Sequence, residues 1–132
     1  MIKKKQQTAK VITPAGMKPK PRQHERDAAE ILALHFNTFV QFLPRANGKS
    51  ADFIIDGVIW ELKSPTGTGK HNIKRQLQYA KHQSVNVIID AGRSKLHKAK
   101  IRREVEYQFG IVKSVKRLLF ISKDKNVVEI KR

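Results

Sequence analysis

Apolar residues recur along the chain with two different spacings, which predict helices alternating with short strands. Helical spacing runs through residues 23–36, with Ala28, Ile31, Leu32 and His35 on one stripe. It returns at 72–83 and 94–109, and Gly110 is expected to end the last helix. Strand-like runs lie at 38–43, 51–63, 85–90, 115–121 and 127–130. A strand, a helix and a strand in succession form a βαβ unit, so the pattern predicts an α/β fold with a small mixed sheet.

Residues 51–63 form the central pattern, because two short apolar runs flank Asp56 and Gly57. An Asp-Gly pair in this setting is a strong signal for a two-residue hairpin turn. Counting outward from the turn places Asp52 opposite Glu61, and strand alternation places Lys63 on the same face. The sequence therefore predicts two carboxylates and one ammonium group close together on a central hairpin.

This cluster predicts a metal-dependent site that hydrolyses phosphodiester bonds. Two opposed acids repel each other, so a hairpin selected for stability alone would avoid the pair. A divalent cation removes the conflict, and oxygen ligands from two acids suit Mg²⁺, with Mn²⁺ as an alternative metal. Lys63 could then orient a water molecule or stabilise charge on the phosphate. The alternative interpretation is a solvated basic hairpin with an ordinary alternation of charges.

Asp52, Glu61 and Lys63 have the Asp…Glu-x-Lys spacing of an active-site signature, and this segment resembles the PD-(D/E)XK nuclease superfamily. Ala51 replaces the proline that gives the motif its name. The resemblance implies a restriction-endonuclease-like fold around a central catalytic hairpin, with the two acids as metal ligands. It also suggests Glu30, on the first helix, as a further catalytic metal ligand, whereas the alternative is ordinary helix surface.

Several polar residues around the hairpin are expected to contact the substrate. They are Lys49, Ser64, Thr66, Gln76 and Gln83. Lys49 could hold a phosphate, and the two hydroxyls lie in a loop at the rim of the site. The glutamines are chosen because nuclease relatives place a substrate-facing polar residue on the helix after the Glu-x-Lys strand. The helix at 94–109 adds a basic surface for the nucleic-acid backbone; its residues are Lys95, Lys98, Lys100, Arg102 and Arg103.

Composition supports a polyanionic partner. The 132 residues carry a formal net charge of +17, which is far more than solubility requires. No apolar segment is long enough to predict a membrane span, and the absence of cysteine excludes thiolate metal sites. Residues 1–22 combine prolines and lysines without apolar periodicity, so a flexible basic linker is expected there. Residues 23–132 are then expected to form one nuclease domain.

A second resemblance concerns the substrate. The wording Ala-Asp-Phe-Ile-Ile-Asp-Gly with Trp-Glu-Leu-Lys-Ser-Pro, the glutamine-containing helix and the Val-Ile-Ile-Asp strand resemble the toxin domains of contact-dependent growth inhibition systems. This likeness implies cleavage of transfer RNA in the cytoplasm of a neighbouring bacterium, delivery within a larger secreted protein, and neutralisation by a cognate immunity protein. A DNA endonuclease of repair, recombination or phage origin has the same core and charge. A non-enzymatic nucleic-acid-binding module would need neither acid.

Overall fold

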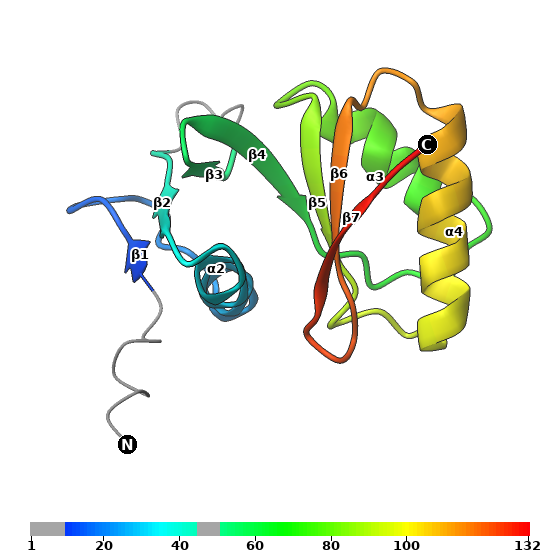
Figure 1. Ribbon diagram of the computed structural model, residues 1–132, viewed down its shortest axis with the longest axis horizontal. Coiled ribbons are helices and arrows are strands. Elements are labelled where there is room, and N and C mark those ends of the chain that lie inside the picture. Colours follow the sequence, from blue (N-terminus) through cyan, green and yellow to red (C-terminus); the bar gives the residue numbers. More distant parts are fainter. Residues whose placement is uncertain (1–9, 45–50) are drawn as a thin grey trace.

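The computed structural model describes residues 10–44 and 51–132, which form a mixed α/β fold around one seven-stranded sheet (Figure 1). The strands are β1 (Lys10–Ile12), β2 (Phe39–Phe42), β3 (Phe53–Ile55), β4 (Val58–Lys63), β5 (Asn86–Asp90), β6 (Arg117–Ile121) and β7 (Val127–Ile130). The helices are α2 (Gln23–Phe36), α3 (Asn72–Ala80) and α4 (Lys98–Ile111). The predicted fold class, an α/β protein with a small mixed sheet, is confirmed.

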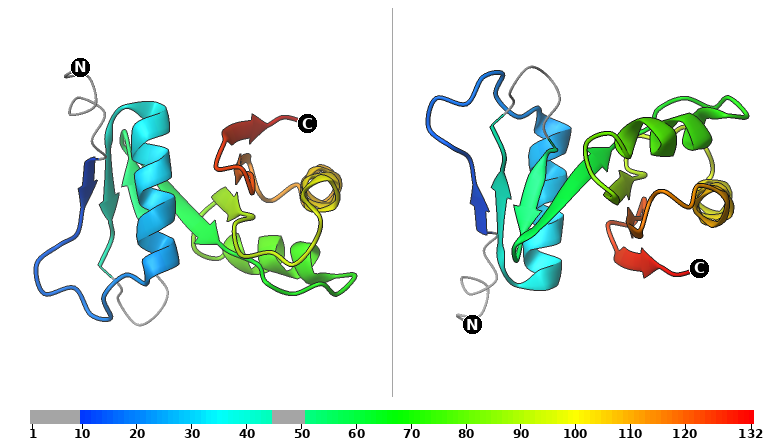
Figure 2. Two further views of the ribbon diagram at one scale, coloured as in Figure 1. Left: turned by 90° about the horizontal axis from the view of Figure 1, so that it is seen from below. Right: turned by 90° about the horizontal axis from the view of Figure 1, so that it is seen from above.

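The strands lie in the sheet in the same order as in the chain, and β4 is the middle strand. β1 and β2 are parallel, whereas β2–β3, β3–β4 and β6–β7 are antiparallel. β5 is parallel to both β4 and β6, as the βαβ pattern predicted. The first half of β4, at 58–60, pairs with β3, whereas the second half, at 61–63, pairs with β5. β4 therefore joins two half-sheets, and Figure 2 shows it crossing from one to the other.

The hairpin turn has the geometry that its sequence predicted. Asp56 has a φ of 48° and Gly57 a φ of 78°, and positive values at both central positions are characteristic of a type I′ turn. The resulting register pairs Phe53 with Trp60 and Ile55 with Val58. The twist of this turn matches that of the flanking strands, so the turn sets the position of every residue farther along the hairpin.

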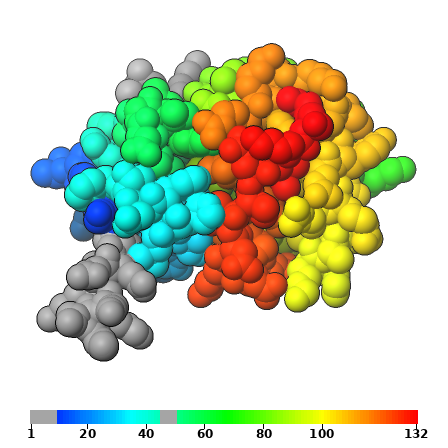
Figure 3. Space-filling model, viewed as in Figure 1, coloured from blue at the N-terminus to red at the C-terminus, as the bar shows by residue number. Residues whose placement is uncertain are grey.

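Helices cover opposite faces of the two half-sheets. α2 packs on the β1–β4 half, and its core also includes Ile88, Leu119 and Ile121 from β5 and β6. α3 and α4 pack on the β5–β7 half, where Val87 and Ile89 alternate with Ile88 and point to the other side. Figure 3 shows α2 (cyan) packed against the β7 hairpin (red), so both halves of the chain belong to one packed body.

Four expectations about the elements and their boundaries differ from the structure. β1 and the buried Met17 lie within residues 1–22, for which a flexible linker was expected. β1 escaped detection because it has only three residues and gains its stability by pairing with β2. α3 ends at Ala80, three residues before the predicted end, and α4 begins at Lys98 instead of residue 94. Gly110 does not end α4; it lies inside the helix, which continues to Ile111.

The apolar stripe of α2 is also rotated from the prediction. The buried residues are Ala28, Ala29, Leu32 and Ala33. Ile31 is only half-buried and His35 is exposed, although both were placed on the inward stripe. Three alanines have little side-chain volume, so they let the helix axis approach the sheet closely. Packing distance therefore outweighed the hydrophobicity of the individual side chains in setting this face.

Candidate functional site

Asp52 and Glu61 meet where β4 leaves β3 and begins to pair with β5. The backbone N–H of Asp52 donates to the carbonyl oxygen of Trp60 at 3.1 Å. The Asp52 carboxylate oxygen Oδ2 accepts a hydrogen bond from the backbone N–H of Leu62 at 2.8 Å. A side chain thus satisfies a strand amide at the junction of the half-sheets. This bond fixes the Asp52 carboxylate beside the β4 segment that carries Glu61.

Glu61 and Lys63 form an ion pair on the second half of β4. The Lys63 Nζ lies 3.3 Å from the Glu61 Oε2. Glu61 is only 6% exposed, and its other oxygen, Oε1, is buried without a hydrogen-bond partner among the described residues. The Lys63 side chain keeps 26% of its surface exposed, so its ammonium group remains accessible from solvent. The pair therefore has one buried acidic partner and one basic partner that can reach a ligand.

The environment of Glu61 disfavours its charged form. Burial and, after it, the neighbouring Asp52 carboxylate raise the pKa of Glu61 from 4.5 to about 8, and Lys63 opposes this shift. A carboxyl group with a strongly raised pKa beside another acid is characteristic of functional sites. A cation bound between the two acids would favour the charged form of Glu61.

The side chains of Asp52, Glu61 and Lys63 lie on the face of the sheet that α2 does not cover. Trp60 and Leu62 pack in the core beneath α2. Because side chains alternate along a strand, Glu61 and Lys63 point to the other face. Asp52 precedes the buried Phe53 and faces the same way as Glu61. The predicted register has therefore brought Asp52, Glu61 and Lys63 to one location.

Two carboxylates are the acidic ligands that this location offers to a metal. Within residues 10–44 and 51–132, no group of three or more His, Cys, Asp or Glu side chains is placed to hold a metal ion. Glu30 is exposed on α2 and is not brought to the other two acids. One or two carboxylates suffice for Mg²⁺, which retains water and takes ligands from a phosphate. The pair, with the unpartnered Oε1 of Glu61, fits such an ion.

The expected substrate-contacting residues lie around this location in differing environments. Lys49 lies outside the residues that the structure describes. Ser64 directly follows β4, and its hydroxyl oxygen is buried without a partner in the described part of the chain. Thr66 is exposed in the loop before α3, whereas Gln76 on α3 and Gln83 beyond it are half-buried. Their contacts with substrate remain predictions.

Part of the expected basic surface of α4 is neutralised within the protein. The Lys98 Nζ lies 3.5 Å from a carboxylate oxygen of Asp124, and Arg102 pairs with Glu106 at 3.0 Å. Another face of α4 borders a groove that was not expected from the sequence. The α4 residues along this groove are Lys100, Glu104, Tyr107, Gln108 and Ile111. Their spacing of three and four residues is a helical signal, but charged residues on such a stripe are ordinarily interpreted as solvated surface.

Asp90, at the end of β5, acts as a cap for the following turn. Its Oδ1 accepts a hydrogen bond from the backbone N–H of Gly92 at 2.9 Å. Burial raises the pKa of Asp90, and the Gly92 hydrogen bond and the nearby His24 and Arg93 oppose this shift. These contacts support the turn and do not connect Asp90 with Glu61.

Comparisons with known proteins give one family match and one structural match. The family model described as the contact-dependent growth inhibition CdiA C-terminal domain matches residues 49–127, which include all three side chains of the cluster. No curated protein sequence matches the chain. A chain of the solved CdiA-CT/CdiI toxin and immunity complex from Burkholderia pseudomallei has a similar fold, with a TM-score of 0.57 at 16% sequence identity. The match covers 93% of this chain and 99% of that one. No helix in the described ranges is long and apolar enough to cross a membrane.

Proposed function

This chain belongs to the contact-dependent growth inhibition CdiA C-terminal domain family, and from this premise we propose that it is a toxin domain with metal-dependent nuclease activity. The reaction is hydrolysis of phosphodiester bonds in nucleic acid, with transfer RNA as the favoured substrate. The active site is of the PD-(D/E)XK type and consists of Asp52, Glu61 and Lys63. The observation that carries this proposal is the buried carboxyl group of Glu61 beside the Asp52 carboxylate and an accessible ammonium group.

The side chains of the cluster have distinct tasks in this reaction. Asp52 and Glu61 would hold Mg²⁺, which supplies Lewis-acid activation of the phosphate and of the attacking water. The Leu62 N–H holds Asp52 in one orientation, so this ligand needs little reorganisation. Lys63 donates hydrogen bonds from a partly exposed position, where it can orient a water molecule or stabilise charge on the phosphate.

The charge of the chain supports a nucleic-acid substrate, because +17 attracts any phosphodiester backbone. Transfer RNA, delivery within a larger secreted protein and action in the cytoplasm of a target bacterium follow from the family assignment as proposals. The neighbour of known structure is a toxin and immunity complex, which supports a cognate immunity protein as a partner of this chain as well.

The test is a cleavage assay with bulk bacterial transfer RNA and with plasmid DNA, each in Mg²⁺, in Mn²⁺ and in EDTA. We expect metal-dependent transfer-RNA fragments from the unaltered chain. Glu61→Gln and Lys63→Ala should each lower the rate at least about a hundredfold, because each removes a group that stabilises the transition state. Circular dichroism spectra should show that both variants remain folded.

Glu106→Gln is the matched control, because Glu106 is an exposed acid whose partner is Arg102 on the same helix. This variant should cleave as the unaltered chain does. Cut DNA with intact RNA would replace the toxin substrate by DNA. If Glu61→Gln and Lys63→Ala both cleave at the full rate, the catalytic assignment is wrong. If the unaltered chain binds nucleic acid but cleaves none with either metal, the binding module becomes the better interpretation.

A further inference from the structure

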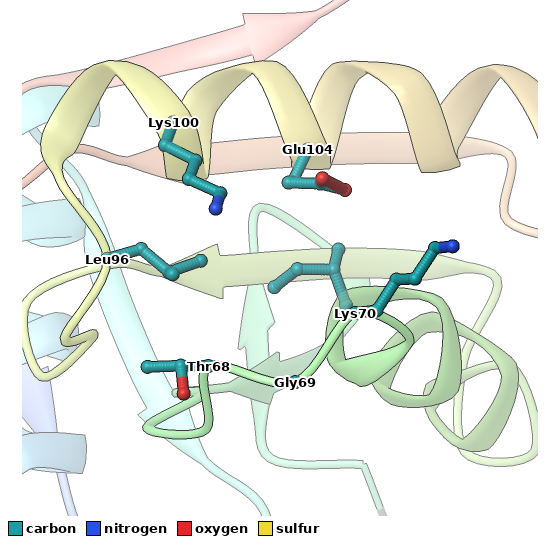
Figure 4. Close-up of a pocket in the computed structure, with 7 residues that line it drawn as sticks. Thr68, Gly69, Lys70, Leu96, Lys100 and Glu104 are labelled. Carbon is teal, nitrogen blue, oxygen red and sulfur yellow. The ribbon is translucent and has the colours of Figure 1, made fainter.

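A polar groove runs between the start of α3 and one face of α4. Two adjoining cavities form it, and Lys70 and Glu104 border both. Figure 4 shows the first cavity, with Lys100 pointing from α4 toward the loop that carries Thr68, Gly69 and Lys70. The second cavity continues along α4 to Tyr107 and Gln108. The groove follows Lys63 in the chain, and the end of the loop at 64–71, which leads from β4 into α3, forms part of its wall.

Cationic side chains dominate the two walls. Lys70, His71 and Lys74 contribute from the start of α3, and Lys100 contributes from α4. No ion pair within the described ranges neutralises these three lysines. Glu104 is the acidic residue of the groove, so anionic groups are expected at the lysines and not beside this carboxylate. The three lysines are distributed over two adjoining cavities, which suits separate phosphates of one strand more than a single compact anion.

Tyr107 offers an unusual surface at the far end of the groove. It is 65% exposed, although it lies on α4 next to the buried Gln108. A tyrosine ring exposed to this extent beside lysines resembles the stacking platforms that bind unpaired bases. Two basic residues of α4 that lie outside the groove, Lys98 and Arg102, are already paired with acids.

Unsatisfied polar atoms support the same location. Gln108 is only 7% exposed, and its Oε1 is buried without a hydrogen-bond partner among residues 10–44 and 51–132. The other buried side-chain atoms of this kind in the described chain belong to Glu61, Ser64 and Asn72. Glu61 lies on the second half of β4 and Ser64 directly after it, whereas Asn72 is the first residue of α3 and Gln108 lies on α4. A buried polar group without a partner costs free energy, so its retention points to a ligand.

We propose that this groove binds an unpaired nucleotide segment of the nucleic-acid substrate, away from the bond that is cleaved. Lys70, Lys74 and Lys100 contact its phosphates, and the Tyr107 ring stacks on a base. Rotation about the broad terminal torsion of Gln108 turns its carboxamide toward the edge of that base. This inference rests on the proposed nuclease function, because it assigns the position of a strand that continues past Asp52 and Glu61.

The experiment measures the affinity of labelled single-stranded RNA and DNA oligonucleotides of one sequence for the full chain in EDTA. Tyr107→Ala should weaken binding about tenfold, which is within the range for loss of one base–aromatic stack. Tyr79→Ala is the matched control, because Tyr79 is 60% exposed on α3 and does not border the groove. Its affinity should equal that of the unaltered chain.

A second pair of variants tests the phosphates through salt dependence. Lys70→Ala with Lys74→Ala should reduce the slope of log affinity against log salt by about 0.7 for each phosphate contact that is lost. Lys113→Ala with Lys116→Ala removes the same charge from exposed positions outside the groove and should leave the slope nearly unchanged. Weaker binding of RNA alone, or of both oligonucleotides, by the groove variants would support the proposal.

Equal affinities for Tyr107→Ala and the unaltered chain, or equal losses in both tyrosine variants, would overturn the proposal. So would unchanged oligonucleotide affinity together with lost binding of the immunity protein, since the groove would then be a protein interface. Cleavage by the unaltered chain is assayed in parallel. If that chain cleaves nothing but the groove variants lose affinity as expected, the groove stands and the nuclease function fails.

Discussion

At the scale of single residues, Glu61 occupies a position that disfavours its own charge. The side chain is almost fully buried and faces Asp52 across the hairpin. The positive charge of Lys63 compensates only in part for this burial and repulsion. Replacing this acid by a neutral residue would relieve the repulsion, so its presence is better explained by chemistry than by stability. The same residue should therefore lower the stability of the metal-free protein in a pH-dependent manner.

Burial and the neighbouring Asp52 carboxylate raise the pKa of Glu61 from 4.5 to about 8, so between these two pH values the folded protein keeps a proton that the unfolded chain has already lost. The free energy of unfolding that depends on this residue is highest below about pH 4.5 and falls as the pH rises toward about 8. Glu61→Gln should remove this decline and be more stable than the unaltered chain at about pH 9. Urea denaturation in EDTA at about pH 5, 7 and 9 measures the effect.

Glu106→Gln provides the comparison for this measurement, because Glu106 is exposed and its substitution leaves Glu61 unchanged. It should retain the pH dependence of the unaltered chain. If Glu61→Gln shows that same dependence, the carboxyl group is ionised in the folded protein at neutral pH, and the assignment of its raised pKa is wrong.

At the scale of elements, two glycines illustrate opposite demands of the backbone. Gly57 has a φ of 78° in the hairpin turn, where a side chain would meet no atom but would strain the backbone. Gly110 lies inside α4, where an added Cβ would have open space. At this position the glycine only increases the conformational freedom of the unfolded chain, which lowers the stability of the fold. Neither position is crowded, so conformational preference alone decides the effect of alanine.

Gly57→Ala should therefore lower the free energy of unfolding by about 1 kcal/mol, whereas Gly110→Ala should raise it by about 0.5–1 kcal/mol. Chemical denaturation of the two variants beside the unaltered chain measures both changes. Each variant serves as the control for the other, since both add one methyl group. Destabilisation by Gly110→Ala would show that α4 does not continue through residue 110.

For the molecule as a whole, β4 is the element that couples the two halves. It pairs with β3 through one half and with β5 through the other, and the core beneath α2 takes side chains from both half-sheets. Loss of either half would expose part of the other half's core. We therefore expect one cooperative unfolding transition.

The single tryptophan, Trp60, lies in the core beneath α2, so its fluorescence reports on that half of the molecule. Far-UV circular dichroism includes α3 and α4 on the other half. The two signals should give the same urea midpoint in the unaltered chain. Separate midpoints would show that the halves unfold independently and that β4 does not couple them.

The hairpin and its acid cluster could be predicted because their determinants are local. Asp56 and Gly57 set the turn, the turn sets the register, and the register brings Asp52 to Glu61 across one pair of strands. The same reasoning predicted the limits of α2, whose helix formers are contiguous, and the strand at β5, whose residues are almost all apolar. Short-range geometry of this kind is contained in the order of residues.

Tertiary packing decided what depends on distant parts of the chain. β1 is stable because it pairs with β2, and the buried face of α2 follows from close approach to a sheet that includes β5 and β6. The burial of Glu61 involves β5, which pairs with its half of β4, and the groove requires the start of α3 beside α4. The sequence by itself thus determined which groups could react, whereas the burial that raises the pKa of Glu61 and the surface that receives a strand arose only from long-range contacts.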